Sequence, residues 1–320
     1  MAQVHGYNIF LGWAEESVYG TVVAANKYAE IEKESLRETR KYAQKPILRT
    51  LSRNRKIKEK MNPAGTIRLP YLWTGLEQLI KNAFGAGSVG TTGPVSTVYT
   101  HTFSLKAAPP IGLTVYLPKD AAATAGTTAY EFPGSLISKL TFDQALGEWL
   151  MLDAEFFARE QLQVAAPTPT YPTFDPVDYT QMTVFTVNPG GSPLVLPLRS
   201  LKISLDNKYD LEGYRLGSEK RMVVNRSAQR EVTFEFEAEF NSETLVDYYQ
   251  LLSETDLQFK WVKDANTDMT ITLPKVVFDG ENPAIDAPGA KLLSMSGTSI
   301  MSAADNDELT VVIRNTTTSV

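Results

Sequence analysis

Two stretches of this chain, about 165 residues apart, follow the same pattern: a β-strand that leads directly into a short amphipathic helix. The first covers 65–84 (GTIRLPYLWTGLEQLIKNAF) and the second covers 230–252 (REVTFEFEAEFNSETLVDYYQLL). Each is preceded by a strand and a long charged connection, and each is followed by several strand-like runs. A chain of 320 residues has room for two domains of ordinary size. The pattern therefore predicts two copies of one β-rich unit, similar in arrangement rather than in matched residues.

In the first copy, Ile67 and Leu69 begin an alternation of apolar and polar residues, which is typical of a strand with one buried face. Thr74 and Glu77 then have the spacing of a capping box that begins a helix. The helix is predicted to end at Gly85, with a buried stripe formed by Leu76, Leu79, Ile80, Ala83 and Phe84. Further strands are predicted over 29–36, 98–105, 113–117, 135–142 and 148–159. Both faces of the last run are rich in apolar residues, which predicts that a neighbouring segment covers its second face.

In the second copy, a strand over 198–205 leads into a charged connection and then into the strand 232–240. Phe234 and Phe236 point to one side of this strand, and the intervening glutamates point to the other. Ser242 is a candidate N-cap for a helix over 245–252. Strands over 257–262, 270–273, 291–301 and 309–315 complete the unit.

These patterns predict an N-terminal arm over 1–28, a first unit over 29–164, a linker over 165–197 and a second unit over 198–320. The linker is predicted because its first part is rich in proline, threonine and alanine. No apolar run is long enough to span a membrane. The absence of cysteine excludes disulfides, thiolate metal sites and cysteine nucleophiles, and it favours folding in a reducing cytoplasm.

The charge of the chain is distributed unevenly. Residues 37–60 contain ten basic and two acidic residues, a net charge of +8, so the remainder carries −14 of the total of −6. This basic loop has a single aromatic residue, Tyr42, and no recognisable nucleic-acid motif. We therefore favour docking of the loop on an acidic surface of another subunit over direct binding of nucleic acid, and a solvated loop is the third possibility.

Side chains suited to catalysis are scarce. The chain has two histidines, and His101 lies in the alternating run VYTHTF, which indicates a strand residue rather than a base. Carboxylates at Asp143, Glu148, Asp153 and Glu155 lie on predicted strands with no spacing that indicates an acid–base pair. The sequence therefore predicts no enzyme, and no catalytic, cofactor or metal-binding residues.

The acidic row of the second copy, Glu235, Glu237 and Glu239, places three carboxylates on one strand face. Like charges at that spacing repel one another, so the face must contact water. Two interpretations remain open. The row is an ordinary solvated sheet face, or it lines an aqueous channel through which a polyanion slides without binding.

The order of several short motifs along the chain resembles the tail tube proteins of long-tailed, non-contractile bacteriophages, in the group whose subunit carries two tube modules. The motifs are Gly12-Trp13-Ala14-Glu15-Glu16-Ser17-Val18-Tyr19-Gly20-Thr21, Glu34-Ser35-Leu36, Leu72-Trp73-Thr74-Gly75-Leu76 with Gly85, Tyr99-Thr100-His101-Thr102-Phe103, Phe132-Pro133-Gly134, Leu201–Asn207 and Gln229–Phe234. No single motif is diagnostic, and the specificity comes from their order over most of the chain.

The resemblance implies a mainly β fold with short helices: two tandem β-sandwich or partial-barrel modules, each with one flanking helix. It implies rings that stack into a tail tube, with three chains of apparent sixfold symmetry or, alternatively, six equivalents per ring. On this basis we expect Glu235, Glu237 and Glu239 to face the lumen, and Arg49, Arg53, Arg55, Lys56 and Lys58 to contact the adjacent ring.

The partners that the resemblance implies are further copies of the chain, tape measure, tail terminator and distal tail proteins, and DNA that passes through the lumen. The protein is expected in the virion tail after synthesis in the cytoplasm of the host bacterium. The alternative is a β-sandwich binding module of a virion that recognises carbohydrate or adheres to a surface.

Overall fold

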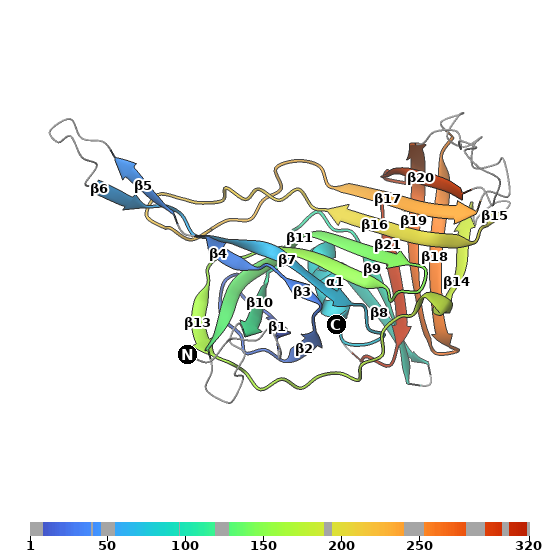
Figure 1. The fold of residues 1–320 in the computed structure, drawn as a ribbon, viewed down its shortest axis with the longest axis horizontal. Coiled ribbons are helices and arrows are strands. Elements are labelled where there is room, and N and C mark those ends of the chain that lie inside the picture. The colour runs from blue at the N-terminus through green and yellow to red at the C-terminus, as the bar shows by residue number, and fades with distance from the viewer. Residues whose placement is uncertain are drawn as a thin grey trace.

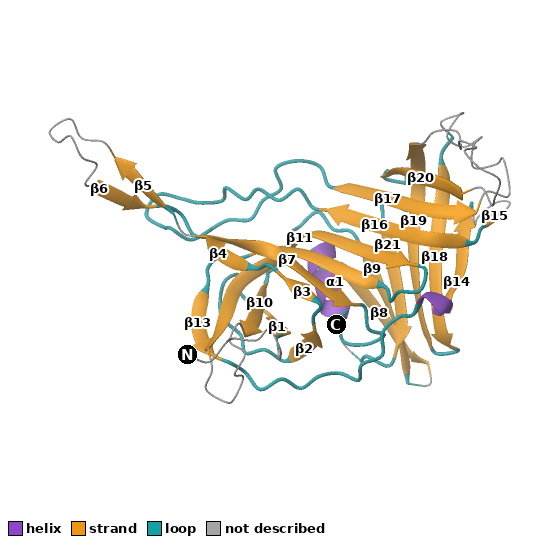
Figure 2. Cartoon of the chain, viewed as in Figure 1, coloured by secondary structure: helices purple, strands orange, loops and turns teal. Residues whose placement is uncertain are grey.

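The computed structural model describes residues 9–39, 41–45, 55–95, 97–118, 128–188, 194–239, 253–279, 292–302 and 307–318. Within these ranges the chain is mainly β, with a single α-helix packed beneath the sheet and one short 3₁₀ helix (Figures 1 and 2). The fold class predicted from the sequence is therefore confirmed. The helix predicted over 245–252 and its candidate cap, Ser242, lie outside the described residues.

The helices are α1 (Glu77–Phe84) and η1 (Tyr179–Gln181). The strands of the first half are β1 (Phe10–Glu15), β2 (Lys27–Glu30), β3 (Lys33–Glu34), β4 (Arg37–Thr39), β5 (Tyr42–Lys45), β6 (Arg55–Lys58), β7 (Asn62–Pro70), β8 (Val89–Val95), β9 (Val98–Ser104), β10 (Leu113–Pro118), β11 (Thr128–Ala145), β12 (Met151–Phe157) and β13 (Leu162–Ala165). Those of the second half are β14 (Met182–Val187), β15 (Leu194–Val195), β16 (Leu198–Asp206), β17 (Glu231–Glu239), β18 (Thr255–Asp264), β19 (Thr267–Asp279), β20 (Leu292–Ser299) and β21 (Thr310–Asn315).

One antiparallel ladder crosses both halves of the chain. It runs β4–β7–β12–β11–β16–β17–β20–β19, and the pairing of β11 with β16 joins the first half to the second (Figure 1). A second link pairs β9 with β21. Strand pairing therefore joins the halves at these two places, and a single large apolar cluster contains residues of both, including the fully buried Trp13, Trp73 and Trp261.

The strand pairings of the first half are repeated in the second. In the first half, β1 pairs with β2 and β10, β10 pairs with β11, β11 also pairs with β12 and β13, and β12 pairs with β7. In the second half, β14 pairs with β15 and β18, β18 pairs with β19, β19 also pairs with β20 and β21, and β20 pairs with β17. The described part of the second half contains no counterpart of the β8–β9 hairpin. The repeat of pattern that the sequence predicts is thus present in the pairing of the strands.

The two copies also share an irregularity. The ladder between β10 and β11 shifts register after Leu113, and that between β18 and β19 shifts after Thr255. Each shift spans a proline, Pro133 in β11 and Pro274 in β19. A proline has no N–H to donate, so a β-bulge is a position where a strand tolerates it.

Strands occur in segments for which the sequence predicts none. β1 and the first half of the short β2 lie at or before residue 28, within the predicted N-terminal arm, and β14 and β15 lie within the predicted linker over 165–197. β1 and β14 pair with corresponding strands, β10 and β18. Phe10, Leu11 and Trp13 are buried, so this part of the predicted arm belongs to the core.

The second face of β12 is covered by the chain itself at its Phe157 end, and Glu155 near its middle is exposed. Phe157 is buried beneath Tyr209, with ring centroids 5.5 Å apart, and beneath the guanidinium of Arg221, 4.7 Å from the ring. Both covering residues belong to the long connection between β16 and β17. At the other end of the strand, Trp149 remains 45% exposed.

The helix α1 buries the stripe expected from the sequence and ends at Gly85, which has a positive φ of 107°. Its predicted start is wrong. The N-cap is Leu76, whose apolar side chain cannot accept a capping hydrogen bond, and Gly75 with a φ of 99° separates Thr74 from the helix. Glu77 does bind backward, accepting a hydrogen bond from the backbone N–H of Gly75 at 2.8 Å.

Glu77 also anchors the C-terminal segment. Its Oε1 accepts hydrogen bonds from Nδ2 of Asn315 at 2.6 Å and from Oγ1 of Thr317 at 2.9 Å. Asn315 donates further to the carbonyl of Trp73 at 2.9 Å and is buried. The end of the second half is therefore fixed to the helix of the first.

Replacing Asn315 with alanine is expected to lower the free energy of unfolding by about 2 kcal/mol, because a buried carboxylate and a buried carbonyl lose their donor. Chemical denaturation followed by tryptophan fluorescence measures the change. Thr316, which is exposed on the same segment, provides the control: its replacement by alanine should change stability by less than about 0.5 kcal/mol. Equal effects of the two substitutions would contradict the anchoring role.

Candidate functional site

The acidic row of β17 lies on the face of the sheet opposite to the core. Val232, Phe234, Phe236 and Ala238 are buried, whereas the glutamates between them are exposed or half-buried. The alternation predicted from the sequence is confirmed, and the orientation of this face toward a lumen stays a prediction.

Basic residues on the neighbouring strand accompany this row. Lys202 of β16 lies opposite Glu235, and Arg199 forms an ion pair with Glu239 at 3.1 Å. The surface formed by β17 and β16 at this point therefore contains basic side chains beside the three carboxylates.

The same polar face extends over both halves through the β11–β16 pairing. Its charged positions alternate with the core residues of β3, β7, β12, β11, β16 and β17. Eight of them are acidic and four basic: Asp143, Asp153, Glu155, Asp206, Glu231, Glu235, Glu237 and Glu239, with Lys33, Arg68, Lys139 and Lys202. Arg199, paired with Glu239, adds a fifth cation. In the two copies, β7 paired with β12 corresponds to β17 paired with β20. When the registers of these two strand pairs are compared, Thr66 and Arg68 occupy the positions that Glu235 and Glu237 occupy in the second half. The two copies thus present different charges at corresponding positions.

Arg68 organises the first-half part of this face. Its guanidinium binds Asp153 at 2.6 Å, Asp143 at 3.0 Å and Glu32 at 3.1 Å. Partial burial raises the pKa of Asp153, and the charge of Arg68 acts in the opposite direction. Two of the carboxylates that sequence inspection considers for acid–base chemistry are therefore held in structural ion pairs.

His101 is a buried strand residue of β9, as the sequence indicates. Its ring nitrogens contact Oγ1 of Thr91 at 3.0 Å and the carbonyl of Thr317 at 2.9 Å. In the part of the chain that the structure describes, no group of three or more His, Asp or Glu side chains is placed to hold a metal ion. Among the same residues, no helix is long and apolar enough to cross a membrane.

The basic loop forms an arm that projects from the body of the molecule (Figure 1). Its described part is the hairpin β5–β6, in which Tyr42 lies opposite Lys58. Tyr42 and Ile57 are about half exposed, at 53% and 54%, and Lys58 is exposed. Of the other residues predicted to contact an adjacent ring, Arg55 and Lys56 belong to β6 and their side chains are not described, while Arg49 and Arg53 lie outside the described residues.

The base of the arm is held by the connection between β16 and β17. The backbone N–H of Met61 donates to the carbonyl of Glu219 at 2.8 Å, Tyr214 donates its hydroxyl to the carbonyl of Met61, and Lys60 forms an ion pair with Glu212. Sequence reasoning gives no role to these residues, because their contacts join segments more than 150 positions apart.

Arg221 secures that connection and is fully buried. Its guanidinium donates to the carbonyl of Ala158 at 2.9 Å, to Oδ1 of Asn62 at 3.0 Å and to the carbonyl of Leu211 at 3.1 Å. Sequence reasoning missed this residue, since a basic residue in a charged loop is normally solvated.

Glu16 links two of the motifs on which the family resemblance is based. Its carboxylate is buried and accepts hydrogen bonds from the backbone N–H of Gly20 at 2.6 Å, that of Gly134 at 2.7 Å and Oγ1 of Thr114 at 2.8 Å. Burial raises the pKa of Glu16, while these donors oppose the shift. The opening motif and the Phe132-Pro133-Gly134 motif are therefore parts of one structural site.

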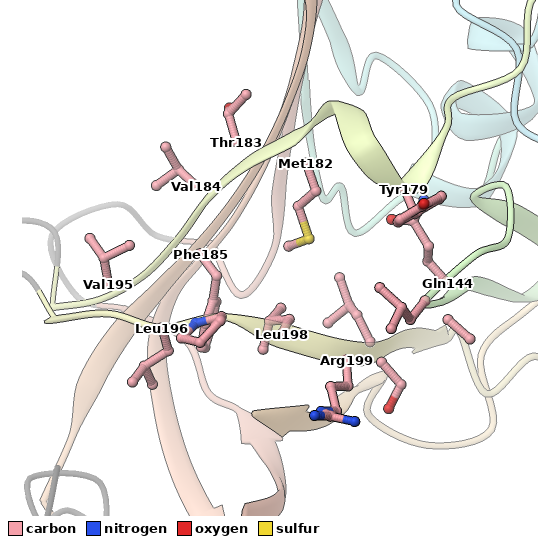
Figure 3. Close-up of a pocket in the computed structure, with 15 residues that line it drawn as sticks. Gln144, Tyr179, Met182, Thr183, Val184, Phe185, Val195, Leu196, Leu198 and Arg199 are labelled. Carbon is pink, nitrogen blue, oxygen red and sulfur yellow. The ribbon is translucent and has the colours of Figure 1, made fainter. Parts of the chain in front are cut away.

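A cavity of about 440 Å³ lies between β14–β15 and β16 (Figure 3). Apolar side chains such as Phe185, Leu196 and Leu198 line it, with Arg199 at its rim. The described residues around it include neither a carboxylate nor a histidine. These lining residues therefore provide no acid–base pair.

A comparison with protein-family models matches residues 6–299 to the family described as phage tail tube protein. No curated protein matches the sequence. The matched region includes the arm, Glu16, the acidic row and the β11–β16 junction, so it contains nearly all of the architecture described above. The chain therefore belongs to the phage tail tube protein family.

Proposed function

We propose that this chain is the repeating subunit of a tail tube in which stacked rings enclose a channel lined by the polar face of the β11–β16 sheet. Membership of the family makes the protein a structural component of the virion tail that self-assembles into a tube. The observation that carries the proposal further is the repeated unit: two copies of one strand arrangement share a continuous sheet, and their polar faces lie on the same side. Such a subunit resembles two neighbouring segments of a ring wall.

In the proposed ring, three chains supply six units, and the second unit begins with β14, which occupies the position that β1 has in the first. The predominance of carboxylates on the shared face disfavours adhesion of DNA, because phosphates bind surfaces rich in lysine and arginine. Tape measure, tail terminator and distal tail proteins are the proposed further partners, and synthesis in the host cytoplasm precedes assembly.

Electron microscopy of the concentrated, purified protein tests the proposal directly. Hollow tubes or rings are expected, and an averaged reconstruction should place β17 against the lumen with three chains in each ring. Particles that remain monomeric even with their tail partners would contradict it. Saturable glycan binding by such monomers would instead favour the alternative of a surface-binding β-sandwich.

Replacing Glu235, Glu237 and Glu239 together with lysine is expected to leave tube formation intact and to reduce the yield of infectious particles by about tenfold or more, because a basic lining retains phosphates. The measurement is a plaque assay of phage whose tube subunit is supplied in variant form. The glutamine triple variant serves as the graded control and should have the smaller effect. Equal yields from the lysine variant and the unmodified chain would remove these residues from the channel lining.

A further inference from the structure

A patch of aromatic and acidic side chains lies at the end of β7 farther from the arm. We name Glu30, Glu148, Trp149 and Phe174 the aromatic–acidic patch. Trp149 and Phe174 are each 45% exposed, and their rings meet edge to face with centroids 5.5 Å apart. Together with Glu30 and Glu148 they line a hollow of about 680 Å³. Two large rings in contact with water and flanked by carboxylates form a surface suited to a partner.

The charge of the patch is negative. Glu30 and Glu148 are exposed, and neither forms an ion pair with any residue that the structure describes. Arg68 also lines the hollow, but three carboxylates, those of Glu32, Asp143 and Asp153, bind its guanidinium. A partner would therefore encounter aromatic faces and two unneutralised carboxylates, which favour lysine and arginine side chains.

The arm of this chain has the complementary chemistry. Its hairpin carries Lys45, Arg55, Lys56 and Lys58 in sequence, and Tyr42 and Ile57 supply exposed apolar surface.

The arm cannot reach the patch of its own chain as the strands are placed. β7 begins next to the base of the arm at Asn62 and ends at Pro70, which lines the hollow. A strand of this length separates the two by about 25–30 Å, and the arm projects away from the body (Figure 1). An arm and a complementary patch at opposite ends of one strand suit a head-to-tail contact between copies, which continues without closing.

We propose that the β5–β6 arm of one copy docks on the aromatic–acidic patch of a second copy. The cations of the arm lie against Trp149 and Phe174 and near Glu30 and Glu148. This inference rests on the proposed function in one respect: within the stacked rings, the aromatic–acidic patch is the surface that receives the arm of the adjacent ring.

The absence of cysteine from the chain permits a direct test by disulfide trapping. Two single-cysteine variants of the full-length protein, Lys58→Cys and Glu148→Cys, are mixed under mild oxidation. The mixture should form a disulfide-linked dimer at about tenfold higher yield than a mixture of Lys58→Cys with Asp264→Cys, in which the second cysteine lies at the exposed β18–β19 turn. A chain that carries both Lys58→Cys and Glu148→Cys should give a ladder of covalent oligomers.

A charge exchange supplies the second measurement. Glu30→Lys with Glu148→Lys should raise the concentration needed for assembly about tenfold at an unchanged melting temperature, and adding Lys56→Glu with Lys58→Glu to the same chain should restore it. Linked-dimer yields no higher than the Asp264→Cys control would overturn the proposal. Unaltered assembly of the Glu30→Lys, Glu148→Lys variant would also overturn it. So would a Lys56→Glu, Lys58→Glu variant that assembles normally but no longer binds duplex DNA, because the arm would then serve nucleic acid rather than a second copy.

The two proposals fail in distinguishable ways. If trapping succeeds but no tube or ring forms, the arm–patch contact stands and the proposed ring stack is wrong. If tubes form and trapping fails, the tube stands and the arm docks elsewhere.

Discussion

Replacing Phe142 with alanine is expected to lower the free energy of unfolding by about 3–5 kcal/mol and to do so in a single transition. Phe142 is buried on β11, between Leu152 of β12 and Ile203 of β16, and its ring meets that of Tyr71 at 6.2 Å between centroids. It therefore lies where the two repeated units share one sheet. Removing the ring leaves a cavity that strands hydrogen-bonded on both sides cannot close.

Denaturant titrations followed both by far-ultraviolet circular dichroism and by tryptophan fluorescence measure this effect. Lys139→Ala, on the exposed face of the same strand, is the matched control and should change stability by less than about 0.5 kcal/mol. Coincident curves that move together would show that the units unfold as one body. Two separate transitions, of which only one shifts, would show instead that the units are independent.

The second large effect is expected from replacing Arg221 with methionine, which should lower the free energy of unfolding by about 3 kcal/mol. The carbonyls of Ala158 and Leu211 and Oδ1 of Asn62 would lose their donor, and each buried acceptor without a partner costs about 1–3 kcal/mol. Part of the loss is offset because methionine removes a buried charge and still covers Phe157.

Limited proteolysis distinguishes this prediction from a general loss of stability. The connection between β16 and β17 should become the first cleavage site, because Arg221 attaches it to the body. Arg215→Met, an exposed substitution in the same connection, should leave both stability and the cleavage pattern unchanged. Resistance of the Arg221→Met protein to proteolysis would show that the other contacts of the connection suffice to hold it.

Much of the fold follows from periodicity. The strand with buried Phe234 and Phe236, the stripe of α1 and the end of that helix at Gly85 could all be predicted, because each depends on neighbours within a few residues. The start of α1 was harder. Thr74 and Glu77 have the spacing of a capping box, but the positive φ of Gly75 and the contacts of Glu77 with the C-terminal segment decide the outcome.

The candidate surfaces show the same division. The exposure of the acidic row follows from alternation along a single strand, whereas its ion pair with Arg199 depends on which strand lies beside it. Arg68, Arg221 and Glu16 carry little local signal, since most of their partners, such as Asp143, Ala158 and Gly134, lie dozens of positions away or more. The receiving patch joins residues near positions 30, 148 and 174, and no spacing in the sequence connects them.

The β11–β16 pairing has a consequence for how a ring of such chains would form. In a ring of paired units, every second junction between neighbouring units is this intramolecular one, and it forms as the chain folds. The covalent link gives that junction a high effective concentration, independent of how much protein is present. In the proposed ring of three chains, three bodies rather than six would meet to close the ring, so nucleation would depend less steeply on the concentration of subunits. Each fused pair can also hold two unlike surfaces, such as Arg68 and Glu237, in a fixed order that separate identical subunits could not maintain.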